Sequence, residues 1–265
     1  GSLQELFADA TNLLKRPVGT LVIEPEKSES LSFWDLIGEH KDEAPEVAID
    51  PEVDLAALPY SSGTTGLTKG VMLSHFNLVS NVQQLLGLTG LAKIVESDIV
   101  LVHLPLFHIY GMNILMNGSI GSGATQVMMG RFVLKEFLDL IEEQKVTKLF
   151  TVPPVGLALS DASNLTGHDL SSLNLAFFGA APLSAELQER IQKELSCPVI
   201  QGYGLTESSP LTNADYAEPQ LQKLGSIGPG AADTEQKIVD VEDSSIEMPY
   251  GETGELIVRG PQVMK

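Results

Sequence analysis

Residues 60–70, YSSGTTGLTKG, combine hydroxyl side chains, glycines and one lysine between two apolar segments. Hydroxyl groups donate hydrogen bonds, glycines allow backbone N–H groups to approach an anion, and Lys69 adds a positive charge. This combination is typical of a loop that binds a polyphosphate. A turn without a chemical role is the alternative, but the ordered hydroxyl run that ends in Gly-x-x-Lys-Gly favours phosphate binding.

The run does not fit the P-loop of kinases and ATPases. That pattern requires a second glycine five residues after Gly63, where Thr68 stands, and a hydroxyl residue after Lys69, where Gly70 stands. The apolar run that follows predicts a strand over 71–74, so the loop is expected to join two strands. A helix is then predicted, with Ser74 as its N-cap and an apolar face formed by Phe76, Val79, Val82 and Leu86.

Two more glycine-rich segments follow predicted strands, FFGAAPLS at 177–184 and QGYGLTESS at 201–209. Ligands of open α/β sheets bind beyond the carboxyl ends of the strands, so neighbouring strands here would share one pocket. A purine could lie along Gly179, Ala180 and Ala181, with Tyr203 stacked on it. Glu207 suits Mg²⁺, which commonly takes one or two carboxylates together with phosphate oxygens. The alternative for Glu207 is a solvated loop residue.

The segment PLFHIYG at 105–111 also follows an apolar strand. Taken alone, His108 between Phe107 and Ile109 is best interpreted as a core histidine with satisfied hydrogen bonds. Beside a nucleotide site, the same side chain could orient a carboxylate or gate its entry.

The elements that must position these residues alternate along the chain. Amphipathic helices are predicted at 134–145 and 184–195, among strands predicted at 20–24, 56–61, 98–104, 125–129, 146–152, 173–179 and 197–203. Strands that alternate with helices predict a mostly parallel sheet with flanking helices, an α/β fold. After Gly225 the segments 235–240 and 254–260 predict a small antiparallel β unit, so we expect one subdomain over 1–224 and the start of another over 225–265. The acidic stretch 41–54 is interpreted as a surface loop and not as a domain linker, because strands alternate with helices on both sides of it.

Composition restricts the partners. The chain of 265 residues is 43% hydrophobic, enough for a sizeable core, and its formal charge of -19 disfavours nucleic acid and anionic membranes. Cys197 is the single cysteine and lies in an apolar context, which indicates a core thiol. Residues 99–130 lack charged side chains, yet their Pro, His, Asn and Gly content favours a buried strand followed by a buried helix over a membrane span.

Five segments together resemble the acyl-adenylate-forming superfamily, which includes acyl-CoA synthetases and luciferases. They are YSSGTTGLTKGVMLSH, PLFHIYG, FFGAAPLS, QGYGLTE and GETGELIVRG, in this order, and their wording is most similar to 4-coumarate:CoA ligases. Thr68 departs from the proline usual at its position. The resemblance implies the large N-terminal domain of an enzyme that activates a carboxylic acid with ATP and Mg²⁺ as an acyl-adenylate and then transfers the acyl group to CoA.

The resemblance also implies roles for individual residues. The β- and γ-phosphates would be held by Ser61, Ser62, Gly63, Thr64, Thr65 and Lys69. The adenine site would comprise Gly179, Ala180, Ala181, Gln201, Gly202 and Tyr203. Thr206 would lie near the α-phosphate and Glu207 would bind Mg²⁺, while Arg131 would contact CoA. The acyl pocket would draw on His108, Tyr110, Ile114, Gly204, Pro210 and Leu211.

Nothing in this sequence matches the family's ribose-binding aspartate, its hinge, or its small C-terminal domain with a catalytic lysine. The family's first subdomain also has no match here. We therefore expect a fragment of the large domain with little or no turnover of its own. Two other functions stay open at this point, a luciferase-like adenylating oxygenase and a non-catalytic module that binds nucleotide or acyl groups. The sequence leaves undecided which acid is used, the oligomeric state, and whether the compartment is cytoplasmic or peroxisomal.

Overall fold

The computed structural model describes residues 21–22, 31–40, 45–61 and 68–265. The chain forms two compact units, Gly1–Ile49 and Asp50–Lys265. In the first unit a parallel pair of two-residue strands is followed by one helix, namely β1 (Leu21–Val22), β2 (Leu31–Ser32) and α2 (Phe33–His40). The boundary between the units falls inside the stretch 41–54, whose described residues are exposed as a surface loop requires. The prediction that this stretch is not a domain linker is therefore wrong. The predicted division at Gly225 stays a prediction.

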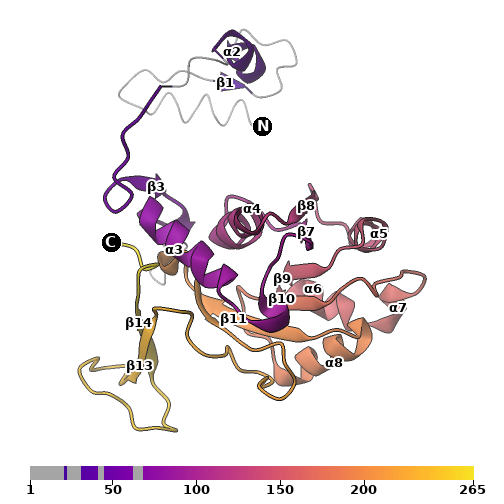
Figure 1. Ribbon diagram of the computed structural model, residues 1–265. Coiled ribbons are helices and arrows are strands. Elements are labelled where there is room, and N and C mark those ends of the chain that lie inside the picture. Colours follow the sequence, from indigo (N-terminus) through magenta and orange to yellow (C-terminus); the bar gives the residue numbers. More distant parts are fainter. Residues whose placement is uncertain (1–20, 23–30, 41–44, 62–67) are drawn as a thin grey trace. The chain divides into compact units, whose positions relative to one another are not determined.

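A six-stranded sheet forms the centre of the second unit (Figure 1). Its strands are β7 (Ile99–Val102), β8 (Thr125–Met128), β9 (Lys148–Thr151), β10 (Leu175–Phe178), β11 (Val199–Gly204) and β12 (Leu211–Ala214). Their spatial order is β12-β11-β10-β9-β7-β8, with all neighbours parallel except the antiparallel pair β11 and β12. The predicted mostly parallel α/β sheet is confirmed.

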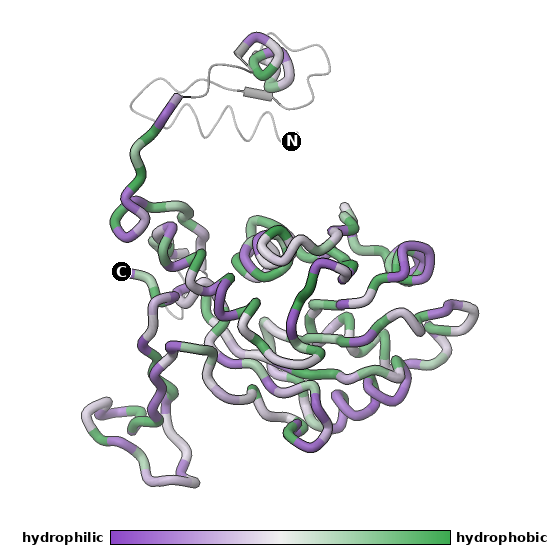
Figure 2. The backbone as a smooth tube through the Cα atoms, viewed as in Figure 1, coloured by the Kyte–Doolittle hydropathy of each residue, from purple (hydrophilic) through white to green (hydrophobic). Residues whose placement is uncertain are grey.

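Helices cover both faces of this sheet. One face carries α5 (Leu134–Gln144), α6 (Pro153–Leu159), α7 (Ala162–Leu165) and α8 (Ala185–Leu195), and the other carries α3 (His75–Leu86), the π-helical segment η2 (Tyr110–Asn117) and α4 (Gly118–Ser122). Successive strand residues serve opposite faces: Ala176 and Phe178 pack toward α8, whereas Leu175 and Phe177 pack toward η2. Both neighbours along a strand are therefore apolar, and the strands are largely green in Figure 2 while α8 is mostly purple.

Three short antiparallel pairs complete the unit. They are β3 (Leu55–Ala57) with β6 (Leu73–Ser74), β4 (Tyr60–Ser61) with β5 (Lys69–Gly70), and β13 (Glu235–Val239) with β14 (Glu255–Arg259). The residues that flank 62–67 form the strands β4 and β5, as the sequence predicts, and 62–67 themselves lie outside the described residues. The predicted C-terminal antiparallel unit is also confirmed.

Helix α3 begins where the sequence predicts but buries a different face. The Ser74 hydroxyl accepts the Asn77 N–H at 3.2 Å, and the Asn77 side chain accepts the Ser74 N–H at 3.0 Å, a reciprocal N-terminal cap. The predicted apolar face is wrong in its first half, because Phe76 and Val79 are 43% and 58% exposed, whereas Val82 is buried and Leu86 packs against the core. The helix also buries polar residues, which are Asn77, Asn81 and Gln84, together with Leu78 and Leu85.

These buried amides bind backbone that arrives from distant parts of the chain. Asn81 donates to the Leu211 carbonyl at 2.8 Å and accepts the Leu211 N–H at 3.0 Å. Asn77 donates to the carbonyl oxygens of Pro261 and Val263 at 2.8 and 3.0 Å. A hydrophobic pattern cannot reveal such a face, because its partners are peptide groups rather than apolar side chains.

The uncharged stretch 99–130 forms β7, η2, α4 and β8, which confirms a buried strand followed by a largely buried helical segment. No helix in the described part of the chain is long and apolar enough to cross a lipid bilayer. Cys197 is buried beside β11, and burial raises the pKa of its thiol to about 12. Such a thiol stays protonated at neutral pH, so the predicted core role is confirmed.

His103 is the buried histidine of this region. Its Nε2 lies 3.0 Å from the Thr151 hydroxyl, and its ring packs edge-on against Phe137 at a centroid distance of 5.0 Å. Burial lowers the pKa of His103 from 6.5 to about 4. The folded protein therefore keeps this ring neutral in a pH range where the unfolded chain protonates it.

We predict that His103 destabilises the protein as pH falls. His103 binds a proton near pH 6.5 in the unfolded chain but only near pH 4 in the folded chain. The free energy of unfolding therefore decreases by about 3 kcal/mol as the pH falls from above 6.5 to below 4. Urea unfolding of wild type and His103→Gln between pH 4 and 7 measures this contribution. The variant should lose less stability on acidification, and an equal loss in both proteins would contradict the prediction.

We also predict that Asn81→Ala lowers the free energy of unfolding by about 2–4 kcal/mol, because the buried N–H and C=O of Leu211 both lose their partner. The matched control is Gln83→Ala, an exposed amide two residues along the same helix. Its unfolding midpoint should stay near wild type. Equal midpoints for the two variants in urea would refute the role given to Asn81.

Candidate functional site

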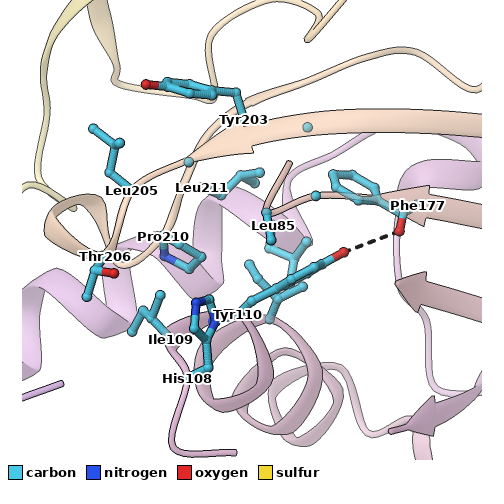
Figure 3. Close-up of a pocket in the computed structure, with 15 residues that line it drawn as sticks. Leu85, His108, Ile109, Tyr110, Phe177, Tyr203, Leu205, Thr206, Pro210 and Leu211 are labelled. Carbon is cyan, nitrogen blue, oxygen red and sulfur yellow. Dashed lines mark hydrogen bonds between the residues drawn. The ribbon is translucent and has the colours of Figure 1, made fainter. Parts of the chain in front are cut away.

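A pocket of about 140 Å³ lies at the carboxyl ends of β10 and β11, between these strands and η2 (Figure 3). The two strands are direct parallel neighbours, so the two glycine-rich segments that follow them do share one site. The lining residues are Leu85, His108, Ile109, Tyr110, Ile114, Phe177, Gly179, Ala180, Gly202, Tyr203, Gly204, Leu205, Thr206, Pro210 and Leu211.

The two ends of the pocket differ in exposure and polarity. Six lining side chains are at most 6% exposed. Ile109 adjoins the exposed His108, and the other five are called the buried end, namely Leu85, Tyr110, Ile114, Phe177 and Leu211. The mouth consists of the exposed residues His108, Ala180, Gly204 and Leu205. Thr206 and Tyr203 lie between these extremes in exposure. A ligand with one polar and one apolar part fits this division.

Tyr110 forms the floor of the buried end. Its hydroxyl lies 3.2 Å from the Phe177 carbonyl oxygen and 3.4 Å from that of Thr151, and Figure 3 shows the first of these bonds. Burial raises the pKa of Tyr110, so the hydroxyl stays protonated and donates. The side chain therefore offers a ring face to the pocket and uses its polar atom to hold the ends of β9 and β10.

His108 is not the core histidine that its apolar neighbours suggest. The residue is exposed, and its Nδ1 accepts the backbone N–H of Tyr110 at 3.2 Å. Partial burial lowers its pKa, which favours the neutral ring. Because Nδ1 accepts a hydrogen bond, the proton of the neutral ring lies on Nε2 and is available to an anionic group at the mouth.

Close packing explains why glycine stands at two positions near the end of β11. A Cβ at Gly204 would lie 2.2 Å from the Pro210 carbonyl oxygen, and one at Gly202 would lie 2.5 Å from the Phe177 ring. Larger residues would push β11 away from its neighbours and open the pocket wall. At the mouth, Ala180 has φ 67°, a left-handed conformation that is uncommon for a residue with a side chain and marks a tightly constrained turn.

The loop over 205–211, which includes the short helix η3 (Thr206–Ser208), is held from behind by two buried asparagines. Asn113 of η2 donates to the Ser209 carbonyl at 2.5 Å, and Asn81 of α3 binds both backbone groups of Leu211. These contacts place Thr206 and Pro210 along the pocket. The asparagines are positioning residues, since neither lines the pocket.

The base of the predicted phosphate loop reaches this site. The Ser61 hydroxyl donates to a Glu207 carboxylate oxygen at 3.0 Å across 146 positions of sequence, and Ser61 pairs with Lys69 in the β4–β5 hairpin. Lys69 is exposed. The other predicted phosphate-loop residues, Ser62, Gly63, Thr64 and Thr65, lie outside the described residues.

Some predicted site residues do not line the pocket. The Gln201 side chain bonds both backbone groups of Leu183 at 3.1 Å, so its amide supports the 181–184 turn instead of facing a ligand. Ala181 and Arg131 are exposed and lie outside the lining. Glu207 is partly exposed and adjoins the lining residue Thr206.

Sequence reasoning missed four lining residues, Leu85, Ile109, Phe177 and Leu205. Three of them stand within two residues of a predicted site residue, and that proximity was a usable signal. Leu85 comes from α3, about ninety positions before the strands it meets, and no local pattern indicates it.

No group of three or more His, Cys, Asp or Glu side chains gathers into a metal site in the described ranges. Glu207 is thus a single carboxylate, held by the neutral donor Ser61. A lone carboxylate fits Mg²⁺ bound mainly through phosphate oxygens and water, and it does not fit a cation held by protein ligands alone.

Known proteins are similar to this chain in sequence. The AMP-binding enzyme family matches residues 4–265. 4-Coumarate–CoA ligase 5 of Oryza sativa subsp. japonica is 41% identical over 239 residues, which cover 88% of this chain and 44% of that protein. The ligase CCL1 of Humulus lupulus is 40% identical over 246 residues, 91% of this chain and 44% of that protein. The chain therefore spans less than half the length of these relatives.

Solved structures give the same fold. A long-chain-fatty-acid–CoA ligase of Archaeoglobus fulgidus superposes with a TM-score of 0.79 at 30% identity, over 90% of this chain and 48% of that one. The anthranilate CoA ligase AuaEII, in complex with anthranoyl-AMP, superposes with a TM-score of 0.85 at 26% identity, over 98% and 49%. With a family match over nearly its whole length, this chain belongs to the AMP-binding enzyme family.

Proposed function

We propose that this chain carries the adenylation site of an ATP-dependent carboxylic acid:CoA ligase. A carboxylate oxygen of the acid attacks the α-phosphorus of ATP and pyrophosphate leaves, which yields an acyl-adenylate. The thiol of CoA then attacks the acyl carbon and AMP leaves. The observation that carries the proposal is the Ser61–Glu207 hydrogen bond, because it joins a residue at the start of the predicted phosphate loop to a residue beside the pocket.

In this proposal the phosphates lie between the 61–69 loop and Glu207. Ser61 and Lys69 bind the β- and γ-phosphates together with Ser62, Gly63, Thr64 and Thr65, and Thr206 lies near the α-phosphate. Glu207 holds Mg²⁺, which neutralises phosphate charge when bound. Neither step needs a protein nucleophile, so these side chains act by positioning and by charge.

The adenine would lie along the backbone of Gly179–Ala181 and Gly202, with Tyr203 stacked on it. Gln201 contributes by holding the turn through Leu183 rather than by direct contact. At the mouth, the Nε2 proton of His108 binds the carboxylate of the acid and orients it toward the α-phosphate. The exposed Arg131 would meet a phosphate of CoA outside the pocket.

The acid itself would occupy the remaining pocket. Its walls are Tyr110, Ile114, Gly204, Pro210 and Leu211, all of which line the cavity. The names of the relatives support a ligase over a luciferase-like oxygenase or a non-catalytic binding module, since they are CoA ligases. The complex of AuaEII with anthranoyl-AMP supports acyl-adenylate binding by this fold.

We predict that the chain binds ATP with Mg²⁺ and that Lys69→Ala weakens this binding about tenfold to a hundredfold, because a charge-assisted contact to phosphate is lost. Isothermal titration measures it. Lys193→Ala, which removes an exposed lysine on α8 outside the pocket, is the matched control and should bind like wild type. Absence of ATP binding, or equal affinities of the two variants, would sink the phosphate assignment.

Glu207→Gln tests the metal role separately. The variant keeps a side-chain oxygen that accepts from Ser61 but loses the negative charge. We expect it to lose most of the difference between ATP affinity with and without Mg²⁺, while affinity without Mg²⁺ changes little. An unchanged Mg²⁺ effect would mean that Glu207 does not hold the metal.

A further inference from the structure

We propose that the buried end of the pocket selects a carboxylic acid whose far end is hydrocarbon and rejects the same acid with a hydroxyl group there. This inference rests on the proposed function and specifies its substrate class. The buried end is Leu85, Tyr110, Ile114, Phe177 and Leu211, and the polar mouth fixes which end of the acid enters first.

The one side-chain hydroxyl at the buried end already donates its hydrogen to the protein backbone. Tyr110 directs its O–H toward the carbonyl oxygens of Phe177 and Thr151, at the ends of β10 and β9. Figure 3 shows this hydroxyl pointing along the wall toward Phe177 and away from Pro210 and Thr206. A ligand that reached the floor would meet the ring of Tyr110.

The amides nearest to this wall are also used. Asn113, the neighbour of Ile114 on η2, donates to the carbonyls of Leu78 and Ser209. Asn81, one turn before Leu85 on α3, donates to Gln84 and Leu211 and accepts from Leu211. Both side chains are fully engaged with the protein and cannot turn to a ligand without leaving buried backbone groups unsatisfied.

Backbone donors around the pocket are paired as well. The Gly179 N–H donates to the Thr151 carbonyl at 3.1 Å, and the Leu205 N–H donates to the Pro210 carbonyl at 3.0 Å. The Tyr110 hydroxyl, the two asparagine amides and these two backbone N–H groups therefore already have partners. A hydrocarbon end loses nothing there and gains from the removal of apolar surface from water.

A hydroxyl on the buried end of the acid would give up its bonds to water and find no free donor among these groups, and the carbonyl oxygens of Phe177 and Thr151 already accept from Tyr110. An unpaired buried hydroxyl weakens binding about tenfold to a hundredfold. Cinnamate and 4-coumarate differ by one such hydroxyl, on the ring carbon farthest from the carboxylate. This chain should thus prefer cinnamate, although its relatives are named for 4-coumarate.

The test is isothermal titration of the full chain, in the presence of ATP and Mg²⁺, with cinnamate and with 4-coumarate. Hexanoate and 6-hydroxyhexanoate form a second pair for an alkyl acid. In each pair that binds, the hydroxylated member should bind about tenfold to a hundredfold more weakly than its partner. Equal or tighter binding of the hydroxylated member in any pair that binds overturns this inference and leaves the proposed function standing. If no acid of either pair binds, the proposed function itself fails for this chain.

Two variants test which side chains cause the difference in affinity between cinnamate and 4-coumarate. Tyr110→Phe should leave the cinnamate to 4-coumarate affinity ratio unchanged, because the deleted hydroxyl does not serve the ligand, whereas a changed ratio would show that it does. Ile114→Thr places a hydroxyl in the wall and should lower the ratio. The control is Ile120→Thr, the same change at a side chain that is 67% exposed on α4. The wild-type ratio decides the inference even where a variant fails to fold.

Discussion

The site depends on one kind of interaction, the binding of buried asparagine amides to the backbone of the loop after β11. Asn81 satisfies both peptide groups of Leu211, and Asn113 binds the Ser209 carbonyl. Hydrogen bonds inside the loop, including Leu205 N–H to the Pro210 carbonyl and Ser208 N–H to the Leu205 carbonyl, fix its local shape. The amides on α3 and η2 bind its last residues and attach the loop to the helices behind it.

The same arrangement explains why polar and apolar chemistry can coexist at this edge of the sheet. Side chains that hold the loop point their polar atoms at backbone, and their apolar neighbours Leu85 and Ile114 complete the pocket wall. At the mouth the chain offers exposed and polar groups, His108 and Thr206, with the Ser61–Glu207 pair adjacent. A ligand with an anionic head and an apolar tail matches both environments, as an acid being activated by ATP does.

Electrostatics at the mouth must work against the charge of the whole chain. The formal charge of -19 repels anions at long range, so a polyphosphate needs donors concentrated at one place. The 60–70 segment provides them in sequence, and the β4–β5 pair brings Lys69 opposite Ser61. In the proposed site, Mg²⁺ on Glu207 would reverse the sign of the charge at this carboxylate, so the metal and the phosphate loop are expected to act together.

Composition and local pattern were sufficient to predict the α/β architecture, because alternating strands and amphipathic helices have few ways to pack. The motifs at the strand ends were sufficient to predict most of the residues that line the pocket. Local pattern failed where partners come from far along the chain. The buried face of α3 was misjudged because its partners are the backbone groups of residues 211, 261 and 263. His108 was interpreted from its apolar neighbours as a core residue, but it is exposed in the turn after β7. Gln201 was expected at the adenine site, but its side-chain amide binds the backbone of Leu183. The sequence by itself determined which chemical groups are available. Only the tertiary structure decided which of them remain free for a ligand, because a polar side chain that binds distant backbone cannot be recognised from its local sequence.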